Sequence, residues 1–161
     1  MDDRSNHRQG HASVGERVRY EEDLYGWAVE QAGLLRAGRV AEADVRNIAE
    51  ELDDVGNEQY DKLESALRII LLHLLKWDHQ PERRSRSWQA SIRVQRKHAL
   101  KVLRKNPGLK PVLDEALVEA YDIARVEAAA QTGLDEGEFA VDCEYDWLQI
   151  MERPIAWPPA D

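Results

Sequence analysis

Two pairs of carboxylates, each one helical turn apart, stand out in the second quarter of the chain. The pairs are Glu51-x-x-Asp54 and Glu58-x-x-Asp61, and this spacing places both members of a pair on one side of a helix. Hard divalent cations prefer several oxygen ligands, and all-helical magnesium-dependent hydrolases use paired acids of this kind. A complete centre needs a second pair from another helix, for which Glu119-x-x-Asp122 is the candidate. Acids at this spacing usually form a solvated helix face, so we predict no metal centre.

An arginine-serine cluster offers the second kind of chemistry. Planar guanidinium groups and the free N–H groups at a helix start both favour a phosphate or a carboxylate. The cluster and its two flanking tryptophans are therefore the candidate surface for an anion or a partner: Arg83, Arg84, Ser85, Arg86, Ser87, Trp77 and Trp88.

The histidines and the cysteine do not form a recognisable catalytic set. His73 and His79 are six residues apart, so they face different sides of a helix and cannot share a metal ion. His73 lies among leucines and is expected to be a buried, hydrogen-bonded core residue. Cys143 is the only cysteine, and no histidine is singled out to activate it. There is no phosphate-binding glycine loop and no serine elbow. We therefore predict no catalytic residues and no cofactor, and the sequence favours a protein that is not an enzyme.

The residues that carry these groups belong to helices, because apolar positions recur every three or four residues. A first helix is predicted over about 21–37, with Gly38 as a left-handed C-cap. Its apolar stripe is Leu24, Trp27, Ala28, Gln31, Leu34 and Leu35. A second helix is predicted over about 43–79, with Ile48, Leu52, Val55, Gln59, Leu63, Leu67, Ile70, Leu74 and Trp77 on one face.

The predicted second helix is long for a compact domain. About 36 residues would span roughly 54 Å, whereas a compact chain of this size is about 40 Å across. We therefore expect a bend at Gly56-Asn57, where glycine makes it least costly. The alternative is a true break at the same place.

Prolines and glycines set the remaining boundaries. After Pro81 a third helix is predicted over about 88–105, capped by Ser85 or Ser87. Pro111 is predicted at the first position of a fourth helix, which Thr132-Gly133 ends. A loop anchored by Phe139 leads to a short helix over about 144–151.

No stretch alternates with period two, so the predicted fold is all-α without a sheet. It is a bundle of four principal helices plus a short C-terminal helix. Residues 1–19 are polar and aperiodic and are expected to be a disordered arm. Residues 20–157 form the predicted single domain, and residues 158–161 form a tail.

Charge is segregated along the chain. Residues 42–64 hold nine acids and two bases, a net charge of −7, and residues 83–105 hold nine bases and no acid, a net charge of +9. Consecutive helices are usually antiparallel neighbours, so one interpretation pairs the basic helix with an acidic one inside the domain. The alternative leaves part of the basic surface free for a polyanion.

Composition limits the classes of function. The 161 residues carry a formal charge of −9 and a mean hydropathy of −0.63, so the overall field disfavours nucleic acid and anionic membranes. The aliphatic runs around His73 are far shorter than the roughly 20 residues that span a bilayer. A single cysteine cannot form an intrachain disulfide and fits a reducing compartment. We expect a cytoplasmic protein without membrane contact.

Four stretches resemble the bacterial family catalogued as domain of unknown function 29. They are YEEDLYGW at 20–27, IAEEL at 48–52, HLLKW at 73–77 and QPERRSRSW at 80–88. The resemblance extends over about 20–157. It implies a small, all-helical bacterial protein and supplies no established activity and no catalytic residue to transfer.

Three hypotheses of function remain open. The leading one is a non-catalytic interaction or scaffold module that binds a protein partner or itself. The alternative is anion or nucleic-acid binding through the arginine-rich turn and the basic third helix. The second alternative is a metal-dependent hydrolase that uses the acidic helix.

Overall fold

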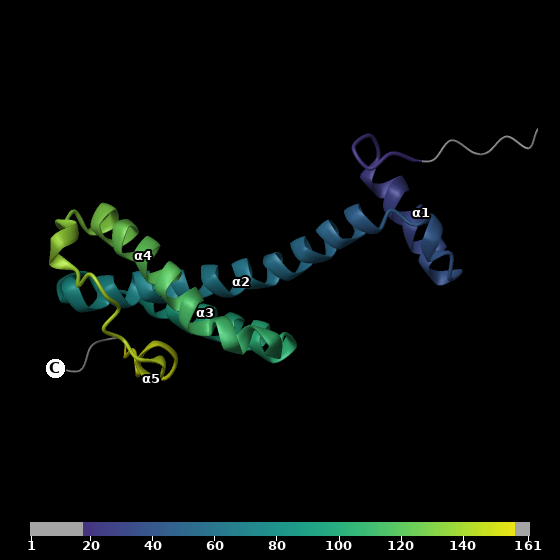
Figure 1. Cartoon of the computed structure of the whole chain (residues 1–161). Helices are drawn as coiled ribbons and strands as arrows, with labels where there is room; N and C mark the ends of the chain where they lie inside the picture. Colours follow the sequence, from purple (N-terminus) through teal and green to yellow (C-terminus); the bar gives the residue numbers. More distant parts are fainter. Residues whose placement is uncertain (1–17, 157–161) are drawn as a thin grey trace, which may run out of the picture. The chain divides into compact units, whose positions relative to one another are not determined.

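The computed structural model describes residues 18–156. Within that range the chain forms four long helices and one short helix, joined by brief 3-10 turns, and contains no strand (Figure 1). The all-α prediction is confirmed. The helices are α1 (Leu24–Arg36), α2 (Val45–His79), α3 (Arg86–Lys105), α4 (Leu113–Thr132) and α5 (Trp147–Met151).

Most of the predicted N-terminal arm and all of the predicted tail fall on residues 1–17 and 157–161, outside the described residues. The chain divides into two compact units, Met1–Leu52 and Asp53–Asp161, which are described separately below. The extent of a single domain over 20–157 therefore stays a prediction. No helix between residues 18 and 156 has the length and apolar character needed to cross a bilayer.

Helix α2 is continuous through Gly56, so the predicted alternative of a break is wrong. A glycine in a helix interior costs about 1 kcal/mol relative to alanine, and a helix of 35 residues has enough other contacts to offset that loss. The helix begins at Val45 because Asp44 caps it, with the Asn47 backbone N–H 3.3 Å from Asp44 Oδ1.

The first unit is organised around that cap. Gln31 Oε1 accepts the backbone N–H of Asp44 at 2.8 Å, and Trp27 Nε1 donates to Asp44 Oδ2 at 3.3 Å. These bonds explain why Trp27 and Gln31 are the buried residues of α1. Three other residues of the predicted apolar stripe, Leu24, Ala28 and Leu35, are exposed. The prediction that they are buried is wrong, because the first unit is short and covers only one side of α1.

Helix α1 is also shorter at its start than predicted. The Asp23 carboxylate accepts the Gly26 N–H at 2.8 Å, so Asp23 is the N-cap rather than a first-turn residue. The predicted glycine caps are confirmed: Gly38 has φ +71° after α1 and Gly133 has φ +75° after α4. In both places a side chain would be strained in the left-handed region.

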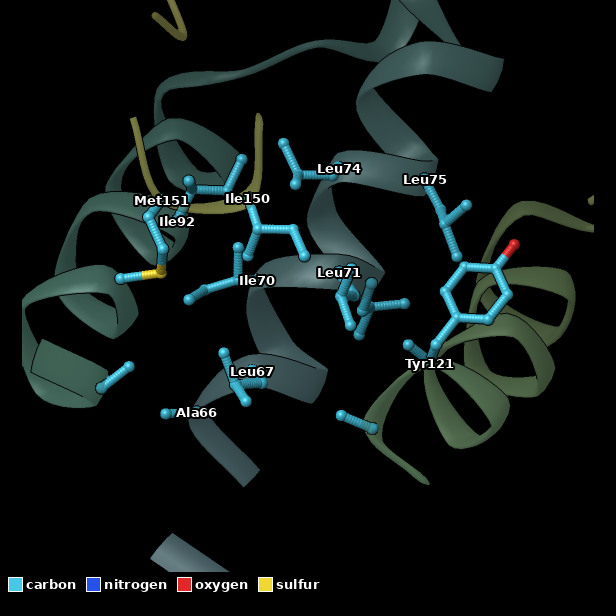
Figure 2. Close-up of a cluster of buried hydrophobic side chains, with 14 of the residues drawn as sticks. Ala66, Leu67, Ile70, Leu71, Leu74, Leu75, Ile92, Tyr121, Ile150 and Met151 are labelled. Carbon is cyan, nitrogen blue, oxygen red and sulfur yellow. The ribbon is translucent and has the colours of Figure 1, made fainter. Parts of the chain in front are cut away.

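The core of the second unit surrounds the C-terminal half of α2. Figure 2 shows that Ile70 points toward Ile92 and Met151, whereas Leu71 and Leu75 point toward Tyr121 of α4. Because neighbours cover different sides of the last turns of α2, the sequence from Ile69 to Trp77 is apolar on nearly every side. Along the N-terminal half of the same helix, residues of the predicted apolar stripe are exposed to solvent: Leu52 is 66% exposed and Val55 is 58% exposed.

The ends of the later helices differ slightly from prediction. Ser85 is the N-cap of α3, with its Oγ accepting from Trp88 N at 3.3 Å, so α3 begins at Arg86. Pro111 does not begin α4 but lies in the 3-10 turn Pro107–Val112, and α4 starts at Leu113.

The short helix α5 begins at Trp147 rather than about 144. Asp146 and Gln149 form a capping box there, with the Gln149 N–H donating to Asp146 Oδ1 at 2.7 Å and the Asp146 N–H donating to Gln149 Oε1 at 2.9 Å. The predicted anchor Phe139 is 1% exposed and is part of the core, as expected.

Arg96 joins α3 to the C-terminal end of α5. Its guanidinium donates to the carbonyl oxygens of Ile150, Arg153 and Gln149 at 2.7, 2.8 and 3.2 Å. The last carbonyls of a helix lack intrahelical partners, and one planar group with several donors satisfies two of them, together with the carbonyl of Arg153 just beyond the helix. The segment that carries Ile150 and Met151 into the core is therefore held from α3.

We predict that Arg96→Ala lowers the free energy of unfolding by about 2–3 kcal/mol, because three charge-assisted hydrogen bonds to the carbonyls of Gln149, Ile150 and Arg153 are lost. Arg96→Lys should recover little, since an ammonium cannot reach three carbonyls in that geometry. Urea denaturation followed by circular dichroism measures the change. Arg93→Ala, an exposed residue of the same helix, is the matched control and should stay within about 0.5 kcal/mol.

Candidate functional site

The arginine-serine cluster contains both exposed and anchored residues. Arg83, Arg86 and Ser87 are exposed, and Ser85 is occupied in capping α3. Arg84 is half-buried: its Nε donates to the Trp77 carbonyl oxygen at 2.8 Å, and its guanidinium carbon lies 5.2 Å from the Trp77 ring centroid. Whether this surface binds an anion stays a prediction.

The two flanking tryptophans lie in different environments. Trp77 is 4% exposed and belongs to the core, where it positions Arg84. Trp88 is half-buried against the core, and the Lys76 ammonium lies 4.5 Å from the centroid of its ring.

Lys76 is a buried charge that the sequence did not single out. It is 8% exposed, and its Nζ donates to Gln131 Oε1 at 2.8 Å rather than to a carboxylate. Burial lowers the pKa of the Lys76 ammonium. An amide dipole and the face of Trp88 thus stabilise the cation. The available sequence signal was a lysine inside an otherwise apolar helix segment.

His73 and His79 lie apart, as their spacing predicted. His79 Nδ1 is 2.8 Å from the Leu75 carbonyl oxygen. His73 is half-buried, and its Nδ1 has no hydrogen-bond partner among residues 18–156. The expectation of a hydrogen-bonded histidine is therefore wrong at that nitrogen. Desolvation, with a smaller contribution from Lys76, lowers the pKa of His73 to about 4.

One side of α3 is a continuous basic surface. We call this surface the basic face, and it consists of Arg86, Arg93, Lys97, Lys101 and Arg104. These five residues are separated by seven, four, four and three positions, which places them on the same side of the helix. All five are exposed. It extends over roughly 27 Å. Val94 and Leu100 are exposed alongside it, so the surface is partly apolar.

The basic helix is not paired with the acidic segment. None of the nine bases of residues 83–105 forms an ion pair with another described residue, so the predicted internal pairing is wrong. The apolar side of α3, including Ile92 and Ala99, packs in the core with the C-terminal half of α2, whereas most of the acids precede that half. Three of those acids pair locally instead: Glu42 with Arg39, Glu50 with Arg46 and Glu58 with Lys62.

The acidic segment of α2 is also open. Leu52 and Val55 are exposed one turn apart on the same side of the helix. Asp54 and Glu58 are exposed on the adjoining part of the same side. We call Leu52, Asp54, Val55 and Glu58 the acidic face of α2.

The paired carboxylates do not converge on one point. Asp61 lines a shallow groove with Glu64, Glu119 and Asp122, but Glu51, Asp54 and Glu58 lie outside it. Burial, then the charges of Glu119 and Asp61, raises the pKa of Glu64, against the opposing effect of Arg68. Within residues 18–156 no three acids, histidines or cysteines are arranged to hold a metal ion.

A cavity of about 330 Å³ lies at the C-terminal end of α2. At its base Arg153 donates to both Asp78 oxygens at 2.8 and 2.5 Å, and Tyr145 Oη donates to Asp78 Oδ2 at 2.8 Å. Tyr121 Oη donates to the Ala140 carbonyl oxygen at 2.7 Å. We call this the C-terminal cavity; its lining is Leu75, Asp78, His79, Tyr121, Glu138, Ala140, Glu144, Tyr145, Gln149 and Arg153.

Sequence reasoning missed this cavity, because its residues come from three helices and a loop. Burial raises the pKa of the Asp78 carboxyl, whereas its hydrogen bonds to Arg153 and Tyr145 and the charge of Arg153 lower it. The net effect is a lowered pKa. Burial raises the pKa of the Tyr121 and Tyr145 phenols, so both stay protonated at neutral pH.

Comparison with known proteins identifies one family. Residues 19–155 match the sequence profile described as domain of unknown function DUF29, which covers most of the chain. No curated protein and no solved structure matches the chain. No activity is therefore transferred to the surfaces described above.

The depressed pKa of His73 predicts a dependence of stability on pH. In the unfolded chain the imidazole binds a proton below about pH 6.5, whereas in the folded protein it does so only near pH 4. The contribution of neutral His73 is complete above pH 6.5 and is lost as pH falls toward 4. Urea unfolding at several pH values should show a smaller slope between pH 6.5 and 4.5 in His73→Gln, by close to one proton. An unchanged slope would show that His73 titrates normally.

Proposed function

Because the chain belongs to the DUF29 family, whose description names no activity, we propose a function from its own surfaces: a non-catalytic interaction module that self-associates. The observation that carries the proposal is that two surfaces of opposite charge are both exposed on one chain and have no ion pair with each other. The basic face of one copy would bind the acidic face of α2 of another.

Charge complementarity supports a second copy as the occupant. Residues 42–64 carry a net charge of −7 and residues 83–105 a net charge of +9. The acidic segment of one copy therefore attracts the basic segment of another copy, whereas two segments of the same sign repel each other. Both surfaces also expose apolar side chains, Leu52 and Val55 on one and Val94 and Leu100 on the other. A contact made only to phosphate would gain nothing from these apolar residues.

Symmetry adds to the expected strength of the contact. In a two-fold dimer the acidic face of each copy would meet the basic face of the other, so every favourable contact would occur twice. Exposed ion pairs contribute about 0–1 kcal/mol each, and the four exposed apolar residues would supply the rest through burial. The same charges would discourage wrong pairings of acidic with acidic surfaces.

A second candidate function is polyanion binding by the basic face. The favouring observation is that five exposed bases share one side of α3 and that residues 83–105 include no acid. Affinity for a nucleic acid would then fall steeply with salt. The net charge of −9 opposes this alternative at long range. A cytoplasmic location is part of the proposal, and the unpaired thiol of Cys143 supports it.

Charge reversal should test the pairing of the two faces. We predict that the parent chain sediments at more than its mass of 18.5 kDa at micromolar concentration and low salt. Arg93→Glu with Lys97→Glu, and separately Asp54→Arg with Glu58→Arg, should each weaken association by at least about tenfold. Mixing the two double variants should restore it, because both contacts of the mixed dimer then join opposite charges.

Lys110→Glu with Asp114→Arg, two exposed positions outside both faces, provides the matched control and should associate as the parent does. A parent chain that is monomeric under these conditions would refute self-association. A polyanion binder would behave differently: a fluorescent oligonucleotide would bind the parent and Asp54→Arg/Glu58→Arg, and would not bind Arg93→Glu/Lys97→Glu.

A further inference from the structure

The C-terminal cavity has a fixed base that is already neutral. Asp78 and Arg153 form a two-pronged ion pair, and the Tyr145 hydroxyl holds the same carboxylate. The three groups satisfy one another, so a ligand that competed for Asp78 or Arg153 would have to break this arrangement. Asp78, Arg153 and Tyr145 therefore define the shape of the cavity and do not attract a charged ligand.

The remaining charge of the cavity is negative. Glu138 and Glu144 line it, are exposed, and have no ion-pair partner within residues 18–156. Residues 135–146 contain six acids and no base. Arg125 of helix α4 is paired with Glu136. The field at the opening therefore favours a cation and repels phosphates and carboxylates.

The walls suit an organic cation better than a bare metal ion. Tyr145 gives aromatic surface and Ala140 gives aliphatic surface, whereas Tyr121 and Leu75 also line the cavity but are each only 2% exposed. Burial raises the pKa of the Tyr145 phenol, so its ring carries no charge at neutral pH. An aromatic wall with carboxylates at the opening is the combination that recognises an ammonium or a guanidinium on a short apolar stem. A metal ion would need converging ligands, and none are found among the described residues.

The size of the cavity limits the ligand. A volume of about 330 Å³ is near the lower end of the roughly 300–1,000 Å³ range of small-molecule sites. It accommodates one side chain of lysine or arginine type, or a free amine of similar length. The negative charge at its opening disfavours a nucleotide, because phosphates are anionic.

We infer that the C-terminal cavity is a binding site for an organic cation, an alkylammonium or guanidinium group whose charge meets Glu138 and Glu144 while its stem lies against Tyr145. The group can belong to a free amine or to a basic side chain of a peptide. The site is separate from the basic face and the acidic face of α2, so it does not depend on the proposed self-association.

The experiment is an NMR titration of the full chain, following backbone amide shifts. The probes are n-butylammonium and methylguanidinium, with n-butanol as the neutral comparison and butyrate as the anionic one. An arginine tripeptide with blocked ends forms a separate arm that distinguishes a peptide side chain from a free amine. We expect saturable shifts with the cations, confined to residues 138–149 and the facing turns of α2 and α4, and no saturation with butanol or butyrate.

Variants then assign the charges. Glu138→Gln with Glu144→Gln should weaken cation binding by at least about fivefold, as expected for loss of two exposed charge contacts. Asp142→Asn removes an exposed acid of the same segment that does not line the cavity, and should change affinity by less than about twofold. Circular dichroism spectra of all variants should match the parent, because the three acids are exposed.

Three results would overturn the inference: no saturation below 100 mM cation, equal binding of butanol, or a loss in Asp142→Asn as large as in the glutamate variant. The Arg93→Glu/Lys97→Glu chain should bind the cations as the parent does. Loss of cation binding with intact association, or the reverse, separates failure of this inference from failure of the proposed function.

Discussion

The second unit depends on one constraint: the last turns of α2, from Leu71 to Trp77, must be covered on nearly every side. Leu71, Leu72, Leu74, Leu75 and Trp77 are distributed around the helix and are each at most 6% exposed, so a single partner helix would leave part of this segment in water. Helices α3 and α4 therefore occupy different sides of α2, and the segment around α5 closes part of the remaining surface through Ile150 and Met151 (Figure 2). The orientation of α3 follows from this packing. Its apolar residues face α2, and its bases face the solvent.

That orientation links the core to the surfaces that we propose to be functional. Arg96 lies at the edge of the buried side of α3 and binds the carbonyls at the end of α5, whereas Arg93 and Lys97 are turned outward. Three neighbouring bases of one helix thus have two roles: one stabilises the fold and two remain available. The Asp78–Arg153 pair has a similar effect at the C-terminal end of α2, where it fixes the base of a cavity and leaves Glu138 and Glu144 unpaired.

Much of the fold could be predicted from the sequence, because local chemistry sets most of it. Apolar periodicity located the four long helices, and Ser85, Gly38 and Gly133 marked ends that the structure confirms. The errors came from tertiary information. Leu52 and Val55 continue the same apolar stripe as Leu67, yet they are exposed whereas Leu67 is buried. The local sequence does not show that the packing of other helices against α2 ends between Val55 and Leu67. Charge totals predicted internal pairing of the basic helix, yet packing decided otherwise. The cavity brings together Asp78, Tyr121 and Arg153 from distant positions, which no spacing rule can foresee.

The span of the core also bears on how the chain folds during synthesis. Leu63 and Ile155 belong to the same buried cluster, so translation must produce more than half of the polypeptide after Leu63 appears before the interior can close. Until then the apolar C-terminal half of α2 is present without the helices that pack against it, and such exposed apolar surface is prone to aggregation. Contacts between residues so distant in sequence also slow folding. The interior of the second unit can therefore close only late in synthesis.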